Sequence, residues 1–166
     1  MKILQLVSVM LFALVTGVFW GTWFSLSRSM DTITAATFLE IGRIMIANLG
    51  RPMSILLPAS ILSAVPIMYK LYRRRETWAF ILATLAVSLM LAALAVTLLV
   101  NVPLDYVFTG WTISTLPADW RAIRDRWEFY HGVRTILSVA SLCSLVGSVL
   151  VSRGPSAMVR VVKRAA

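Results

Sequence analysis

Four long apolar segments dominate this sequence, at residues 3–26, 52–72, 77–100 and 133–151. A helix needs about 20 apolar residues to cross the hydrocarbon core of a bilayer, and each segment comes close to or exceeds that length. Because lipid offers no partner to backbone N–H and C=O groups, such segments are restricted to helices that satisfy their own backbone. The sequence therefore predicts an all-α fold, a four-helix transmembrane bundle, in a single domain over residues 1–166.

The charged residues favour a membrane protein over a nucleic-acid-binding protein. The chain is 59% hydrophobic and 14% charged, and its net charge is +9. The basic residues form short clusters at the ends of apolar segments and do not spread over one soluble face, so no nucleic-acid partner is expected. The single cysteine, Cys143, lies inside an apolar segment and can form no internal disulfide.

The same basic clusters predict the orientation in the membrane. Loops rich in Lys and Arg stay in the cytoplasm, so both termini are expected there, and the N-terminal segment, which has no cleavage site, is expected to be a retained helix. A bacterial inner membrane is the expected location, since the chain lacks organelle-targeting signals. The residues that mark the cytoplasmic side are Lys2, Lys70, Arg73, Arg74, Arg75, Arg153, Arg160, Lys163 and Arg164.

Two additional helical segments are predicted on the outer side, at about residues 31–49 and 117–132. The first mixes apolar and polar residues, with Asp31 as a cap and Gly50 as a stop, and it is expected to lie at the interface or to extend the bundle. The second carries Asp119 in its first turn, where the helix dipole favours an acid. Both outer connections are therefore expected to be structured.

Individual residues predict where the membrane helices begin, end and bend. Pro52 suits a first helical position, and Thr77 suits an N-cap. Asn101, two residues before a proline, is expected to end the third helix, and Gly154 is expected to end the last. Two prolines inside the second segment are expected to bend it, Pro58 and Pro66.

The strongest candidate for a functional surface is one face of the last helical stretch. Its residues recur at spacings of three and four, which places them on one side of a helix. Aromatic and cationic residues at the outer end give way to serines further in, and such a face is unsuited to lipid, so it should point into the bundle. The members of this face are Trp120, Arg124, Trp127, His131, Arg134, Ser138, Ser141 and Ser148.

Three residues of this region are candidates for chemistry. His131, the only histidine, is the natural proton acceptor or donor near neutral pH. Arg134, one turn deeper, can hold a ligand oxygen or an anion, and Asn101 at the end of the third segment can join them. A structural role explains each residue too: an interfacial histidine satisfied by water, a snorkelling arginine and a helix cap.

Several chemistries find no support in the sequence. It has no phosphate-binding G-x-x-x-x-G-K-[ST], no G-x-S-x-G, no H-E-x-x-H and no cysteine pair. A metal held by His131 with Glu40, Asp105 or Asn101 stays an alternative, although the ligands are mostly oxygen and no spacing demands it.

Three motifs resemble a family of small four-helix membrane proteins described as anthrone oxygenase-like. They are G-x-x-x-G-x-W-F-S at residues 17–25, N-V-P-L-D at 101–105, and R-x-R-W-x-x-x-H-x-V-R-T at 124–135. In that family the third helix commonly ends in N-V-P-L-N, and the fourth opens with W-x-R-W-N-H-V-R-T. Here Asp105 stands in place of the usual Asn, and three residues separate Trp127 from His131 where the usual spacing is shorter.

The resemblance implies an oxygenase that oxidises a flat aromatic or phenolic substrate with dioxygen and that needs no dedicated cofactor. A base removes an acidic C–H proton, the electron-rich anion reduces dioxygen, and hydrogen-bond donors stabilise the developing charge. His131 would be the base, with Arg134 and Asn101 as charge stabilisers. Four residues would bind the substrate, Trp127, Trp111, Asp105 and Arg124, with the two tryptophans as flat walls.

A second interpretation is a non-catalytic accessory or structural subunit of a membrane protein complex. Its Trp-Arg face would then grip another membrane protein, a lipid head group or a bound pigment. An enzyme should contain a cavity at the outer end lined by His131, Arg134 and Asn101. A subunit should instead have this face filled by its own side chains or exposed to a neighbour.

Overall fold

The computed structural model describes residues 2–152, apart from the side chains of residues 27, 28 and 31. Within this range the chain forms five α-helices joined by short helical turns and loops. The elements are α1 (Lys2–Gly21), the π-helix η1 (Thr22–Leu26), the 3-10 helix η2 (Ser27–Thr32), α2 (Ala35–Arg73), α3 (Thr77–Val96), the π-helix η3 (Thr97–Asn101), α4 (Val102–Gly110) and α5 (Trp120–Val151).

The helices confirm the predicted all-α architecture of a membrane protein. Residues 2–152 contain no strand. Four helical stretches are long and apolar enough to cross a membrane: Lys2–Leu26, Ala35–Arg73, Thr77–Gly110 and Trp120–Val151. Large apolar side chains cover their outward faces, and such an apolar surface belongs in lipid and not in water.

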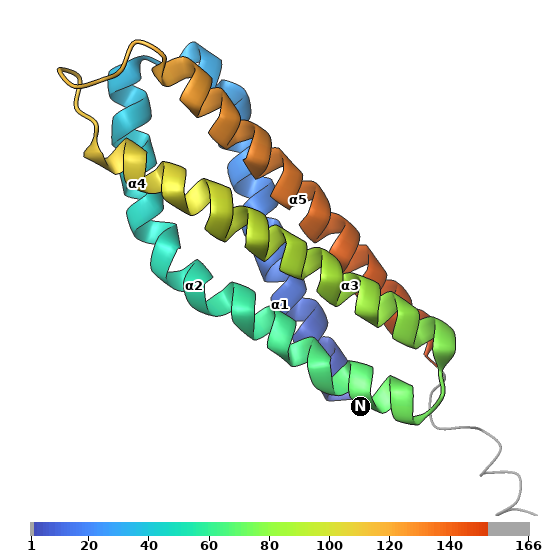
Figure 1. Ribbon diagram of the computed structural model, residues 1–166. Coiled ribbons are helices and arrows are strands. Elements are labelled where there is room, and N and C mark those ends of the chain that lie inside the picture. Colours follow the sequence, from blue (N-terminus) through green and yellow to red (C-terminus); the bar gives the residue numbers. More distant parts are fainter. Residues whose placement is uncertain (1, 153–166) are drawn as a thin grey trace, which may run out of the picture.

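The helices run side by side along one axis, and α2 is bowed along its length (Figure 1). The start of α1 and the end of α5 lie at the same end of the molecule, where Gln5 Nε2 donates a hydrogen bond to Ser152 Oγ at 3.3 Å. The opposite end, which we call the α4 end, is formed by η2, α4 and the start of α5. Part of the predicted basic cluster and the predicted stop at Gly154 lie outside the described residues.

The second membrane helix is longer than the sequence predicted. α2 has 39 residues and runs through both Gly50, the predicted stop, and Pro52, the predicted first position, so both predictions are wrong. Gly50 does not adopt a positive φ, and Pro52 removes only one backbone donor, so neither residue ends the helix. Most of the predicted outer segment 31–49 is therefore the first half of α2. Of the two predicted alternatives, the segment extends the bundle.

The cap of α2 is Thr34, whose side chain accepts a hydrogen bond from the backbone N–H of Thr37 at 3.2 Å. The side chain of Asp31, the predicted cap, lies outside the described part of the chain. At the start of α3 the N-cap position is Glu76, and Thr77 is the first helical residue, so the predicted cap is wrong by one position.

The third membrane helix does not end at Asn101, as the sequence predicted. Asn101 has helical backbone angles of φ −66 and ψ −48, and the chain continues into α4. The break is a π-turn, in which the N–H of Val102 donates to the carbonyl of Thr97. The wider turn lies just before Pro103, which has no N–H to donate, so the predicted stop is a bulge in a continuing helix.

α5 joins the predicted segments 117–132 and 133–151 into one helix of 32 residues. Its predicted inward face is confirmed, because Trp120, Arg124, Trp127, His131, Ser138, Ser141 and Ser148 are all buried. Arg134 is half-buried.

Small residues hold α5 close to its neighbours. α3 presents the buried alanines Ala79 and Ala86, and their carbonyls accept hydrogen bonds from Ser148 Oγ at 2.7 Å and Ser141 Oγ at 2.6 Å. On the α1 side, Thr135 Oγ1 donates to the carbonyl of Phe19 at 3.1 Å. Small and hydroxyl residues are what allow helices to pack closely in lipid, and this pairing fixes the position of α5 in the bundle.

Candidate functional site

A cavity of about 300 Å³ lies between α1, α2, η3, α4 and α5, in the half of the bundle nearer the α4 end. Most of its wall is apolar. Nine residues of α2, from Gly42 to Pro58, form one side of it. The polar and tryptophan side chains in the wall are Thr22, Ser54, Thr97, Asp105, Trp127, His131 and Arg134.

His131 and Arg134 form the basic part of this wall. Arg134 Nη2 lies 2.8 Å from His131 Nδ1 and 3.2 Å from Nε2. A guanidinium has donors only, so the imidazole offers it a ring nitrogen without a hydrogen, as a neutral imidazole does. The Arg134 guanidinium also lies over the Phe19 ring at 4.4 Å, and its Nε is buried without a hydrogen-bond partner.

Trp127 lies against His131, one turn earlier on α5. Their ring centroids are 4.0 Å apart, and both residues are buried. Trp127 Nε1 donates a hydrogen bond of 2.7 Å to Asp105 Oδ1 on α4. The Asp105 carboxylate also attracts the charge of Arg134. Two helices thus hold an aromatic ring, an imidazole, a guanidinium and a carboxylate on one side of the cavity.

Asn101 lies behind this wall and does not line the cavity. It is fully buried, and its Nδ2 donates to the backbone carbonyl of Trp127 at 3.3 Å, which ties η3 to α5. Its Oδ1 is buried without a hydrogen-bond partner. The geometry gives Asn101 a position from which it holds the backbone of Trp127.

The anthrone oxygenase family matches residues 43–144. The chain belongs to the anthrone oxygenase family. The match covers α3, α4 and most of α5, and it includes Asp105, Trp127, His131 and Arg134. It confirms the resemblance found in the sequence motifs. No curated protein and no solved structure matches this family member.

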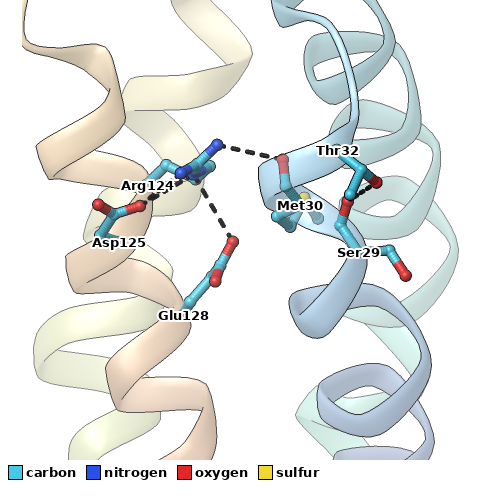
Figure 2. Close-up of polar contacts among 6 residues, drawn as sticks. All are labelled: Ser29, Met30, Thr32, Arg124, Asp125 and Glu128. Carbon is cyan, nitrogen blue, oxygen red and sulfur yellow. Dashed lines mark hydrogen bonds and ion pairs between the residues drawn. The ribbon is translucent and has the colours of Figure 1, made fainter.

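Trp111 and Arg124 do not line the cavity of this anthrone oxygenase family member, although the sequence analysis assigned both to substrate binding. Trp111 packs on Phe108, with ring centroids 5.1 Å apart, and its carbonyl accepts a hydrogen bond from Arg43. Arg124 is buried nearer the α4 end. It donates to the carbonyl of Met30 at 3.1 Å and contacts the carboxylates of two neighbours on α5, Asp125 and Glu128 (Figure 2).

The sequence analysis assigned no residue of α2 to the site, although α2 forms one side of the cavity. Gly42 is buried, and a Cβ added to it would meet nothing within 4 Å. Gly50 is exposed and also lines the cavity, and a Cβ added to it would likewise meet nothing within 4 Å. Glycine is unfavourable inside a helix and indicates a special packing requirement. Two glycines eight residues apart in an apolar stretch could therefore have indicated that α2 lines a cavity.

A metal ion would need several acidic, histidine or cysteine side chains close together in the part of the chain that the structure describes. Among them, no three His, Cys, Asp or Glu side chains lie close enough together to hold one metal ion. Around the cavity the wall instead offers one imidazole, one guanidinium and one carboxylate, a set suited to proton transfer and to stabilising an oxygen anion.

Proposed function

We propose that this protein oxidises a flat phenolic or ketonic aromatic compound of the anthrone type with dioxygen. The observation that carries the proposal is a cavity with mostly apolar walls and one basic side made by His131 and Arg134. Its volume of about 300 Å³ is at the lower end of the range for small-molecule pockets. A compact polycyclic ligand with one oxygen at its edge suits such a space.

The first step of the proposed reaction is the removal of a proton from the CH₂ carbon opposite the ketone. The electron pair left behind spreads over the rings onto the ketone oxygen and gives a phenolate. Arg134 is placed to donate to that oxygen, and a donor aimed at developing charge in an apolar site lowers the barrier strongly. The Phe19 and Trp127 rings offer flat surfaces to the ligand.

Arg134 controls when His131 can act as the base. In the structure Arg134 occupies a nitrogen of the imidazole. A ligand oxygen beside Arg134 competes for the guanidinium, and the ring nitrogen that Arg134 releases becomes the proton acceptor. Substrate binding and activation of the base are coupled in this way.

The second step uses dioxygen as the oxidant. The substrate anion gives one electron to dioxygen, and the superoxide formed combines with the ring radical to make a C–O bond. Protonation gives a hydroperoxide. Loss of the remaining hydrogen from that carbon, with cleavage of the O–O bond, forms the second carbonyl and releases water. The balance is one dioxygen consumed and one water released for each quinone, with the substrate as the reductant.

The orientation of the chain is part of the proposal. Lys2 and the basic connection between α2 and α3 lie at the end opposite α4. The positive-inside rule then places that end in the cytoplasm and the cavity toward the other side of the membrane. A bacterial inner membrane agrees with this arrangement.

The test is turnover of anthrone by the protein purified in mild detergent. The expected result is anthraquinone formation faster than the uncatalysed oxidation, with one dioxygen consumed for each quinone. Native mass spectrometry of the protein purified from its own host is the companion measurement. No turnover together with a membrane protein partner at fixed stoichiometry would refute the proposal and support the accessory-subunit interpretation.

A further inference from the structure

The cavity is exposed on one side only. Among the described residues that line it, those exposed are Gly50 and Ser54 on α2 and Leu98 on η3. The lining residues from α1, α4 and α5 are buried or half-buried. The exposed rim therefore lies between α2 and η3.

This rim belongs to the faces that point into the membrane. Leu98 is 55% exposed and shares a helix face with Leu91, seven residues earlier and also exposed. Ser54 precedes Ile55, which lies on one face with Leu62, seven residues later, and both are exposed apolar residues. Both stretches lie inside helices long and apolar enough to cross the bilayer. The rim thus faces hydrocarbon.

Local chemistry explains why α2 and η3 leave a gap at this place. Pro58 has no N–H, so the carbonyl of Ser54 loses its usual helical donor, and proline bends a helix away at such a point. Figure 1 shows α2 bowing away from α3 between its two ends. Gly50 and Ser54 are small, so no large side chain of α2 fills the gap there.

The two ends of the bundle are packed with side chains. At the α4 end, a cluster that includes Met30, Phe38, Phe108 and Trp120 packs above the cavity. Below it lies the main core, which includes Phe12, Met90 and Leu145. A ligand coming from water along the bundle axis would have to displace one of these clusters, whereas the rim on α2 and η3 is already exposed.

We propose that the cavity is filled sideways from the bilayer, through an opening bordered by Gly50, Ser54 and Leu98. The substrate is then an uncharged polycyclic compound dissolved in the membrane. That substrate class rests on the proposed function, whereas the opening rests on the exposed rim alone. The polar edge of the ligand enters first and meets His131 and Arg134 at the inner wall.

The opening can be tested without any substrate. Gly42 lines the cavity and a Cβ there meets nothing within 4 Å, so Gly42→Cys places a thiol in the cavity. The same protein carries Cys143→Ser, which removes the exposed native thiol. In liposomes, the membrane-soluble reagent N-phenylmaleimide is expected to label this thiol at least tenfold faster than a charged sulfonated maleimide. Leu98→Trp is expected to slow the labelling at least tenfold.

Leu99→Trp is the matched control, since Leu99 is the next residue, is 76% exposed and does not line the cavity. Its labelling rate should stay within about twofold of the parent. Ser54→Trp provides a second block from the α2 side. Equal labelling rates in the Leu98 and Leu99 variants, or faster labelling by the charged reagent, would overturn the proposal. Failure of the proposed function would appear only in the anthrone assay.

Discussion

Arg134 Nη2 lies 2.8 Å from Nδ1 of His131, one helical turn away on α5. This contact joins the only histidine of the chain to a cation in the wall of an apolar cavity. In the proposed reaction the two residues act together, because Arg134 either contacts the imidazole or stabilises a ligand oxygen.

Arg134→Lys is expected to lower kcat/KM for anthrone by about tenfold or more. Lysine keeps the charge but lacks the planar group that donates to the imidazole and lies over the Phe19 ring. Steady-state kinetics in detergent measures the effect. Arg126→Lys, an exposed position on the same helix, should change kcat/KM by less than twofold. Equal losses in the two variants would deny Arg134 a role at the site.

Gly42→Leu is expected to fill the cavity while leaving the fold intact. The new side chain extends into open space, so turnover of anthrone should fall at least tenfold, and helix stability should rise by up to about 1 kcal/mol. Gly17→Leu is the control, since a Cβ there also meets nothing within 4 Å and Gly17 does not line the cavity. Thermal unfolding and turnover are measured together. Full activity of Gly42→Leu would mean that the ligand binds elsewhere.

Asp105→Asn and Asp105→Ala separate the hydrogen bond of Trp127 from the charge of Asp105. Asparagine can still accept the bond from Trp127 Nε1, whereas alanine leaves this N–H without a partner, at a cost of about 1–3 kcal/mol. Unfolding in detergent should therefore show Asp105→Ala as the less stable variant. Equal stability of the two variants would show that the bond contributes little.

Ser141→Ala tests the contact between α3 and α5 that positions the site. The change removes the hydrogen bond to the Ala86 carbonyl and should cost about 0.6 kcal/mol of unfolding free energy, a typical value inside membranes. Ser144→Ala is the control, since Ser144 donates to Ala140 within its own helix. A larger loss from Ser144→Ala than from Ser141→Ala would contradict the packing described here.

The inward face of α5 could be predicted from the sequence because one helix determines it. Once the segment is helical, spacings of three and four place Trp127, His131 and Ser138 on one side, and their polar or aromatic character excludes lipid. Burial in the structure confirms this face. Depth along the helix was harder to assign. Arg124 is seven residues from His131, a rise of about 10 Å, and that distance takes it away from the cavity.

The continuity of α2 through Gly50 and Pro52, and of the helical chain through Asn101, could not be predicted because packing overrides local preference. Gly50 and Pro52 are signals for a helix boundary, yet α2 continues through both, and Gly50 lines the cavity. Asn101 resembles a helix stop but is the last residue of a π-turn, and its amide reaches the backbone of Trp127. Both outcomes depend on contacts between helices, which local sequence does not contain.

The central claim is that His131 removes the proton that starts the oxidation. The most direct measurement is the rate of dioxygen consumption with anthrone by His131→Ala, compared with the unchanged protein and corrected for uncatalysed oxidation. The account predicts a loss of about 10²–10⁴-fold with folding retained, the usual contribution of a general base. An unchanged rate of dioxygen consumption in His131→Ala would contradict it.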